Sequence, residues 1–333
     1  GGLMFYHLLY PLHVHFGVFN VFRYISFRAA MATATALLIS LVIGPRMIRH
    51  LEQFQIGQEI REEGPESHQV KRGTPTMGGI LIITAMALPT LLWADLTNEF
   101  VWLAVVATLG FGTIGFIDDY TKVARRRNLG LTARAKFLLQ IGFASALGVV
   151  VVAYFGVDSL AARMTFPFFK DVALGLGWWY VPFAVLVLTG TSNAVNLTDG
   201  LDGLAIGSTL IAAAAFTVLA YCAGHALVAD YLGIPNVRGA GELTVFCGAM
   251  VGASLGFLWF NCHPAEVFMG DVGSMALGGA LGTVALLIKQ EFLLVVVGGL
   301  FVLCLLYTSP SPRDQSLYLV CRLLLENGGG GGG

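Results

Sequence analysis

Long apolar segments recur along the chain and alternate with short polar loops. A bilayer core about 30 Å thick needs about 20 apolar residues in a helix that rises about 1.5 Å per residue. Nine segments come near that length, so the pattern predicts an all-α polytopic membrane protein with about nine transmembrane helices. The predicted spans are residues 22–45, 77–94, 100–117, 137–155, 175–191, 204–221, 243–260, 274–288 and 292–306.

The composition agrees with this pattern. Charged residues make up 12% of the 333 residues, which is about half the share of about 25% in a soluble domain. Mean hydropathy is +0.76. The five cysteines have no CxxC spacing and most lie in or beside apolar spans, which favours packing over metal binding. We therefore predict a single transmembrane domain over residues 1–306, and no nucleic-acid partner.

The basic residues are unevenly distributed and predict the orientation. They crowd the loops after the first and third spans, and loops rich in Lys and Arg stay on the cytoplasmic side. Alternating loops then place the amino terminus in the periplasm. Residues 1–20 lack the features of a cleavable signal, so we expect an interfacial lead-in. We expect residues 307–333, rich in Pro, Ser and Gly, to be a non-native or disordered tail.

Four polar clusters fall at the predicted cytoplasmic ends of the helices. The first is KRGTPTMGG at residues 71–79, in which Lys71, Thr76 and the glycine backbone could contact phosphate oxygens. Lys71 could equally be a charge that only sets topology. The second is IDDYTK, in which Asp118 and Asp119 point about 100° apart on a helix. We expect one to bind a metal or basic partner while the other stays free as a base; alternatively, both pair with Lys122 or Arg126.

The third cluster is NAVNLTDGLDGLA at residues 193–205. Its Asn193, Asn196, Asp199 and Asp202 recur every three residues and form one slowly rotating ridge if helical. Gly200 and Gly203 would loosen that helix. Such residues also cap helix ends, but four exceed what one cap requires, so we favour a site for substrate and metal.

The fourth cluster, FNCHPAEVFMGDVGS, contains Asn261, His263, Glu266 and Asp271. We expect Gly270 and Gly273 to leave room for a ligand beside Asp271. Mg²⁺ prefers a few carboxylate oxygens together with substrate phosphate and water. Carboxylates for a hard cation, amides for a sugar or base, and cations for phosphate are together typical of phosphoryl transfer. A membrane enzyme with a cytosolic site indicates one lipid substrate and one soluble substrate.

These motifs, in this order, resemble the MraY family of phospho-N-acetylmuramoyl-pentapeptide-transferases, within the polyprenyl-phosphate N-acetylhexosamine-1-phosphate transferases. The resemblance covers about residues 19–302 and includes FNVFRYISFRA, GPESHQVKRGTPTMGG and GFIDDYTKV as well as the third and fourth clusters. It implies a bacterial inner-membrane enzyme that joins undecaprenyl phosphate to the sugar phosphate of UDP-MurNAc-pentapeptide, releases UMP and forms lipid I. It also implies a homodimer in the lipid bilayer.

The resemblance implies roles for individual residues. Asp271 would coordinate Mg²⁺, and Asp118 and Asp119 would act on the lipid phosphate or the metal. Substrate would be bound by the remaining polar residues, which are Lys71, Thr76, Lys136, Asn193, Asn196, Asp199 and Asn261. The family continues with a His-rich loop and a last transmembrane helix. Neither follows residue 302 here, and the seven histidines include no triplet, so we expect weak or no activity from this chain as written.

Two other functions remain open. A UDP-GlcNAc:undecaprenyl-phosphate GlcNAc-1-phosphate transferase would share the acidic motifs. The residues of the first and third clusters, however, resemble the muramoyl family more. A secondary transporter would also be apolar and polytopic. Transporters usually place ionisable groups near the middle of the bilayer, whereas the acidic clusters here fall at helix ends.

Overall fold

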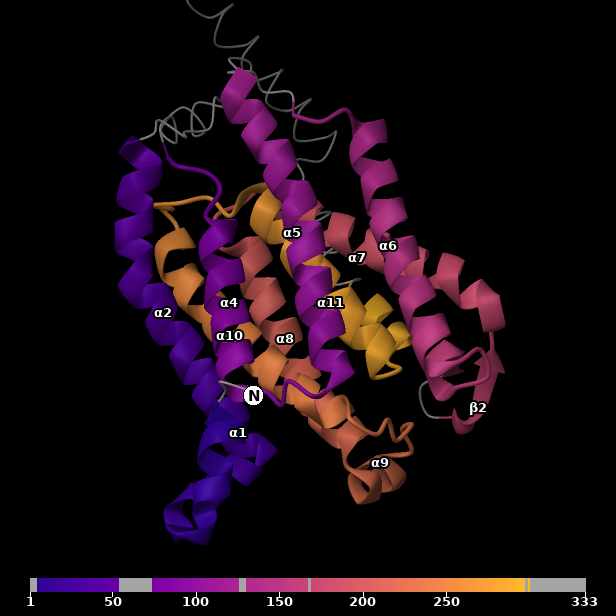
Figure 1. The fold of residues 1–333 in the computed structure, drawn as a ribbon. Coiled ribbons are helices and arrows are strands. Elements are labelled where there is room, and N and C mark those ends of the chain that lie inside the picture. The colour runs from indigo at the N-terminus through magenta and orange to yellow at the C-terminus, as the bar shows by residue number, and fades with distance from the viewer. Residues whose placement is uncertain (1–4, 54–73, 126–129, 167–168, 297–298, 300–333) are drawn as a thin grey trace, which may run out of the picture.

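The computed structural model describes residues 5–53, 74–125, 130–166, 169–296 and 299 (Figure 1). The α-helices are α1 (Phe5–Leu9), α2 (Ile25–Gln53), α4 (Gly79–Trp93), α5 (Glu99–Arg125), α6 (Ala133–Phe155), α7 (Tyr180–Thr198), α8 (Leu204–Gly224), α9 (Ala226–Leu232), α10 (Leu243–Asn261) and α11 (Gly270–Leu287). Short 3₁₀ turns are η1 (Tyr10–Val14), η2 (Gly17–Arg23), η3 (Leu160–Ala162), η4 (Gly177–Trp179) and η5 (Ala240–Glu242). Two strands, β1 (Arg163–Phe166) and β2 (Phe169–Gly175), complete the order.

The helices confirm an all-α polytopic membrane protein. Within the described residues, seven helices are long and apolar enough to cross a bilayer, namely α2, α5, α6, α7, α8, α10 and α11. Helix α4 is apolar but has only 15 residues. The first eight predicted spans therefore each correspond to a helix. The ninth lies mostly outside the described part of the chain, although residues 291–296 are helical.

Several helices extend beyond the predicted spans, α2 and α5 by the most. Helix α2 continues through Pro45 to Gln53. Proline removes only one backbone N–H donor, and the helical hydrogen bonds before and after it keep the helix together. Helix α5 continues past Ile117 to Arg125. Apolar runs mark the part of a helix inside the bilayer core, and a helix does not have to end where the lipid does.

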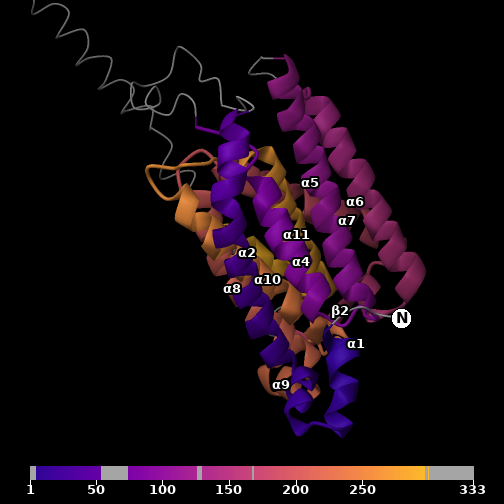
Figure 2. The same cartoon turned by 60° about the vertical axis from the view of Figure 1, so that its left-hand side comes forward.

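Helix α11 lies at the centre of the bundle, in contact with α4, α5, α7 and α8, while α10 packs against α2, α4 and α8 (Figures 1 and 2). Glycines of α10 lie at its contact with α2. A Cβ added at Gly252 would lie 2.1 Å from the Thr33 carbonyl oxygen, and one at Gly256 would lie 2.4 Å from Ser40 Cβ. Small residues let these backbones approach closely.

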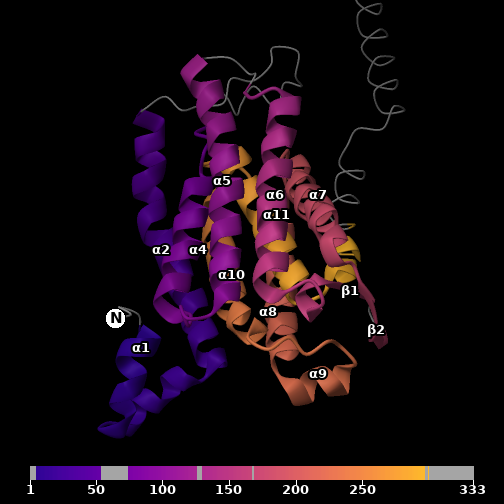
Figure 3. The same cartoon turned by 45° about the vertical axis from the view of Figure 1, so that its right-hand side comes forward.

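A small β-hairpin follows α6, where the apolar pattern predicts only a loop. Strands β1 and β2 pair antiparallel, with Arg163 opposite Gly175. Thr165 Oγ1 donates to the Lys289 carbonyl oxygen at 2.8 Å, which ties the hairpin to the chain just after α11. Helices α1 and α9 lie at the same end of the bundle as β2 (Figure 3). The other end is therefore where α5 and α7 finish and α4, α6 and α11 begin.

A buried ion pair joins α2 to the start of α10. Arg28 Nη1 and Nη2 lie 2.7 and 2.6 Å from the two carboxylate oxygens of Glu242, and Arg28 is 2% exposed. Glu242 also accepts the Asp95 backbone N–H at 2.9 Å. Removing one partner of such a pair leaves an uncompensated buried charge.

We expect Arg28→Met to lower the free energy of unfolding by about 3–5 kcal/mol. The measurement is a thermal or denaturant unfolding curve of the detergent-solubilised protein. Arg23→Met is the matched control, because Arg23 is exposed and exposed charges contribute little. Equal stability of the two variants would contradict an important role for the pair.

Candidate active site

Three carboxylates converge at the end of the bundle where α5 finishes and α11 begins. Asp118 and Asp119 lie near the end of α5, and Asp271 lies in the first turn of α11. One oxygen from each carboxylate lies within 4.8 Å of the other two. The Asp118 and Asp119 residues are each 3% exposed. Buried acids held this close require cations to balance their charge.

Backbone donors fix the two α5 carboxylates in place. Leu131 N–H donates to Asp118 Oδ1 at 2.8 Å, and Val272 N–H donates to Asp119 Oδ2 at 3.1 Å. Val272 is in the first turn of α11, where free N–H groups and the helix dipole favour negative charge. The fold thus holds these oxygens rigidly.

Two lysines supply positive charge to the cluster. Lys122 Nζ lies 2.7 Å from Asp118 Oδ2, 3.1 Å from Asp119 Oδ1 and 2.7 Å from Asp271 Oδ2. Lys136 Nζ, from the first turn of α6, lies 3.0 Å from Asp271 Oδ2 and 4.0 Å from Asp118 Oδ2. Three carboxylates therefore face two ammonium groups, so one negative charge of the cluster is not balanced by a lysine.

Helix α7 contributes an amide that holds Asp271. Asn196 Nδ2 donates to Asp271 Oδ1 at 2.5 Å and to Ser274 Oγ at 2.8 Å. The third cluster is helical up to Thr198, and the helix then breaks before Leu204. Gly203 adopts a positive φ of 75° at that break, as expected of a glycine that interrupts a helix.

Asp199 and Asp202, which follow α7, contact the first residue of α11 and the loop before it, respectively. Burial raises the pKa of Asp199 well above its usual range, and the negative charges of Asp271 and Asp119 add to this, while the Gly270 N–H opposes it. Asp202 Oδ2 lies 3.1 Å from His263 Nδ1. His263 thus contacts the third cluster rather than the carboxylate cluster.

The remaining predicted residues lie around the cluster rather than in it. Asn193 Nδ2 donates to Gln140 Oε1 at 2.9 Å. Asn261 accepts the Gly203 N–H at 3.1 Å and donates to the Val267 carbonyl at 2.9 Å, so it shapes the loop before α11. Thr76 packs beside Gly270, where an added Cβ would lie 3.0 Å from its Oγ1. Lys71 falls outside the described residues.

Glycines allow three helices to meet at the cluster. A Cβ on Gly115 of α5 would lie 2.1 Å from the Asp271 carbonyl oxygen, and one on Gly79 of α4 would lie 2.0 Å from the Gly273 backbone nitrogen. A Cβ on Gly270 would lie 2.5 Å from Asp119 Oδ2. The expectation that Gly270 and Gly273 leave room for a ligand is therefore wrong, because neighbouring protein atoms already occupy the space where a side chain of either residue would lie.

The expectation that one of the two neighbouring aspartates stays free is also wrong. Lys122 follows Asp118 by four residues and Asp119 by three, so its long side chain reaches both carboxylates from the same helix. The alternative prediction, that both aspartates pair with Lys122, is confirmed by these contacts. The spacing DDxxK within one helix is the signal for this pairing, whereas Ser274 is not among the predicted site residues.

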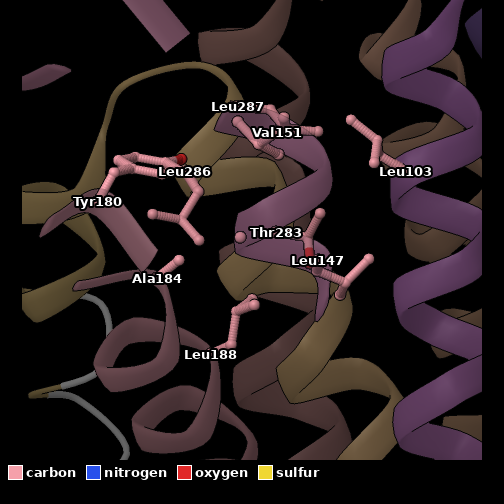
Figure 4. A pocket seen from close by; sticks show the side chains of 10 residues that line it. Leu103, Leu147, Val151, Tyr180, Ala184, Leu188, Thr283, Leu286 and Leu287 are labelled. Atoms are coloured by element: carbon pink, nitrogen blue, oxygen red, sulfur yellow. The ribbon is translucent and has the colours of Figure 1, made fainter. Parts of the chain in front are cut away.

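An apolar pocket lies far from these groups. It is lined by α5, α6, α7 and α11, with Tyr180, Leu188 and Leu286 among its residues (Figure 4). Leu286 is 15 residues after Asp271, which corresponds to about 22 Å along α11. The pocket therefore has no part in chemistry at the carboxylates.

Comparison with known proteins assigns the sequence of this chain to a family. Residues 101–289 match the model of glycosyl transferase family 4, and residues 71–83 match phospho-N-acetylmuramoyl-pentapeptide-transferase signature 1. The chain is 57% identical over 319 residues to the phospho-N-acetylmuramoyl-pentapeptide-transferase of Koribacter versatilis, with 90% of this chain and 84% of the relative covered. The chain belongs to the phospho-N-acetylmuramoyl-pentapeptide-transferase family.

Further relatives of the same name support the assignment. The enzyme of Nitratidesulfovibrio vulgaris is 57% identical over 299 residues, which cover 90% of this chain and 82% of the relative. That of Desulfotalea psychrophila is 54% identical over 300 residues, with 90% and 83% covered. The family model spans Asp118, Asp119 and Asp271, so the cluster lies within the part of the chain that defines the family.

Proposed function

We propose that this chain transfers phospho-MurNAc-pentapeptide from UDP-MurNAc-pentapeptide to undecaprenyl phosphate, in a bacterial inner membrane, and thereby forms lipid I and UMP. The observation that carries the proposal is the cluster of Asp118, Asp119 and Asp271 with two lysines at one end of a membrane bundle. The family to which the chain belongs favours UDP-MurNAc-pentapeptide over UDP-GlcNAc as the substrate. Acids at a helix end, rather than in the middle of the bilayer, disfavour a transporter.

The carboxylate cluster fits a magnesium ion. Mg²⁺ takes hard oxygen ligands at about 2.0–2.1 Å, and it binds through one or two carboxylates plus substrate phosphate and water. Three carboxylate oxygens within 4.8 Å of one another supply such a donor set. Asp271 is its central ligand in our proposal, with Asp118 and Asp119 beside it. Bound Mg²⁺ supplies charge stabilisation to the pyrophosphate in the transition state.

The chain's own residues then position the two substrates. Lys136 binds a phosphate oxygen, and Asn196 keeps Asp271 in its orientation through the amide contact at 2.5 Å. In this proposal the residues Lys71, Thr76, Asn193 and Asp199 bind the nucleotide sugar, while Asn261 supports the loop before α11 through its two backbone hydrogen bonds. The lipid phosphate is largely deprotonated at pH 7, because the second pKa of a phosphate monoester is about 6. Its oxygen attacks the sugar-linked phosphorus of UDP-MurNAc-pentapeptide directly, the bond from that phosphorus to the UMP oxygen breaks, and UMP leaves. Little general-base catalysis is needed.

The test is turnover by the purified, detergent-solubilised protein. UDP-MurNAc-pentapeptide and undecaprenyl phosphate with Mg²⁺ should give UMP and lipid I in equal amounts. UDP-GlcNAc should give little product, and a preference for it would replace our proposal with the GlcNAc-1-phosphate transferase. A phosphorylated protein trapped without lipid phosphate would rule out direct attack.

A further inference from the structure

Lys122 occupies the position between the three carboxylates. Its ammonium nitrogen lies 2.7, 3.1 and 2.7 Å from oxygens of Asp118, Asp119 and Asp271, which come from two different helices. An ammonium carries three donors and no acceptor, so three carboxylate oxygens satisfy it completely. Lys122 therefore holds the end of α5 to the start of α11.

The same oxygens are those that a divalent ion would need. Asp271 Oδ2 already accepts from Lys122 and Lys136, at 2.7 and 3.0 Å, while Asp271 Oδ1 accepts from Asn196. Both oxygens of Asp271 are thus occupied by protein donors. A metal ion and an ammonium repel each other strongly at contact distance in a buried site, so Lys122 and a divalent ion cannot share the cluster.

Lys122 is the member of the cluster that can move. Its side chain is 35% exposed, compared with 5% for Asp118 and 4% for Asp119. The lysine stem has four flexible carbons, whereas backbone N–H groups fix the two aspartates. Lys136 is less exposed, at 17%. Displacement of Lys122 toward solvent therefore requires no change in the backbone.

We propose that Lys122 is a built-in counter-ion that holds the carboxylate cluster together without metal and that a divalent ion must displace it to bind. This inference rests on the proposed function, because it takes the cluster to be the metal site. Lys122 is then a positioning residue that sets metal affinity. If the closed position of Lys122 is favoured about 10:1, it weakens apparent metal affinity about tenfold.

We expect Lys122→Met to bind Mn²⁺ about tenfold more tightly than the wild type in the absence of substrates. Mn²⁺ is the probe, and free Mn²⁺ is measured by its EPR signal in titrations of the solubilised full chain. Arg134→Met is the matched control, since it removes one positive charge from an exposed position on α6 close to Lys136. Its affinity should equal that of the wild type.

A second measurement needs no variant, in case Lys122→Met fails to fold. Lysine labelling of the wild-type protein with an amine-directed reagent, read by mass spectrometry, should increase at Lys122 when Mn²⁺ is added. The increase follows because the displaced ammonium leaves the three carboxylates and reaches solvent. Unchanged or decreased labelling at Lys122 would overturn the proposal.

The outcomes separate this inference from the proposed function. Unchanged or weaker Mn²⁺ binding in Lys122→Met, or equal tightening in Arg134→Met, would overturn the counter-ion role alone. If wild type and Asp271→Asn bind Mn²⁺ equally, the cluster is not the metal site and the inference falls with it. Lipid I formation by the same wild-type preparation then decides independently whether the transferase proposal stands.

Discussion

Asp271→Asn is expected to reduce lipid I formation to below about a thousandth of the wild-type rate. Loss of a single group that stabilises charge in a transition state typically costs about 10²–10³ in rate. Asp271 is in addition the carboxylate proposed to hold the metal. The substitution preserves shape but removes the charge that faces Lys122 and Lys136, 2.7 and 3.0 Å away. The measurement is the initial rate of UMP release with both substrates saturating.

The control for this prediction is Asp158→Asn. Asp158 is exposed and follows α6, at the end of that helix far from Lys136, so its loss should leave the rate unchanged. Both variants should be checked for wild-type unfolding temperature, which separates loss of chemistry from loss of fold. Full Mg²⁺-dependent turnover by Asp271→Asn would end the proposed metal role of this residue.

The helices could be predicted from the sequence because each crosses the same thickness of lipid. An apolar run of the right length therefore marks a transmembrane helix, and eight of the predicted spans match described helices. The ends were less predictable. Helix α5 carries Asp118 and Asp119 inside its helical part, since the polar last turns of a helix leave no trace in an apolar pattern. The β1–β2 hairpin was missed because its strands, of 4 and 7 residues, are too short to count as membrane spans.

The candidate site could be predicted only as far as side-chain chemistry allows. Asp118, Asp119, Asp271 and Asn196 were singled out because ionised and amide groups near a membrane need a reason, and the structure brings them together. Which groups touch depends on how α5, α7 and α11 pack, and no local spacing encodes that. Lys122 illustrates the limit, because the spacing along α5 predicts its pairing with Asp118 and Asp119 but not its contact with Asp271.

The close approach of α5 to α11 makes Gly115 the second position with a large expected effect. Gly115 lies one turn before Asp118 and Asp119, and its backbone faces the carbonyl of Asp271, with 2.1 Å between that oxygen and an added Cβ. Real Cβ atoms do not approach so closely, so Gly115→Ala must push α11 away from α5. Asp271 would then move relative to both α5 carboxylates.

We expect Gly115→Ala to lower kcat about a hundredfold, because a misplacement of about 1 Å in an active site can cost that much. Overpacking should also lower the free energy of unfolding by about 1–3 kcal/mol. Gly142→Ala in α6 is the matched control, since an added Cβ there meets nothing within 4 Å. It should keep full activity, and alanine's better helix propensity should keep or raise its stability.

The two readouts together identify the cause. A Gly115→Ala protein that stays folded, loses turnover and binds Mn²⁺ more weakly than the wild type would indicate that the spacing between α5 and α11 sets the geometry of the cluster. Activity equal to that of Gly142→Ala would contradict this, because it would mean that α11 can shift without disturbing the carboxylates. The cluster would then depend on Lys122 and Asn196 for its geometry rather than on the contact between the two helix backbones.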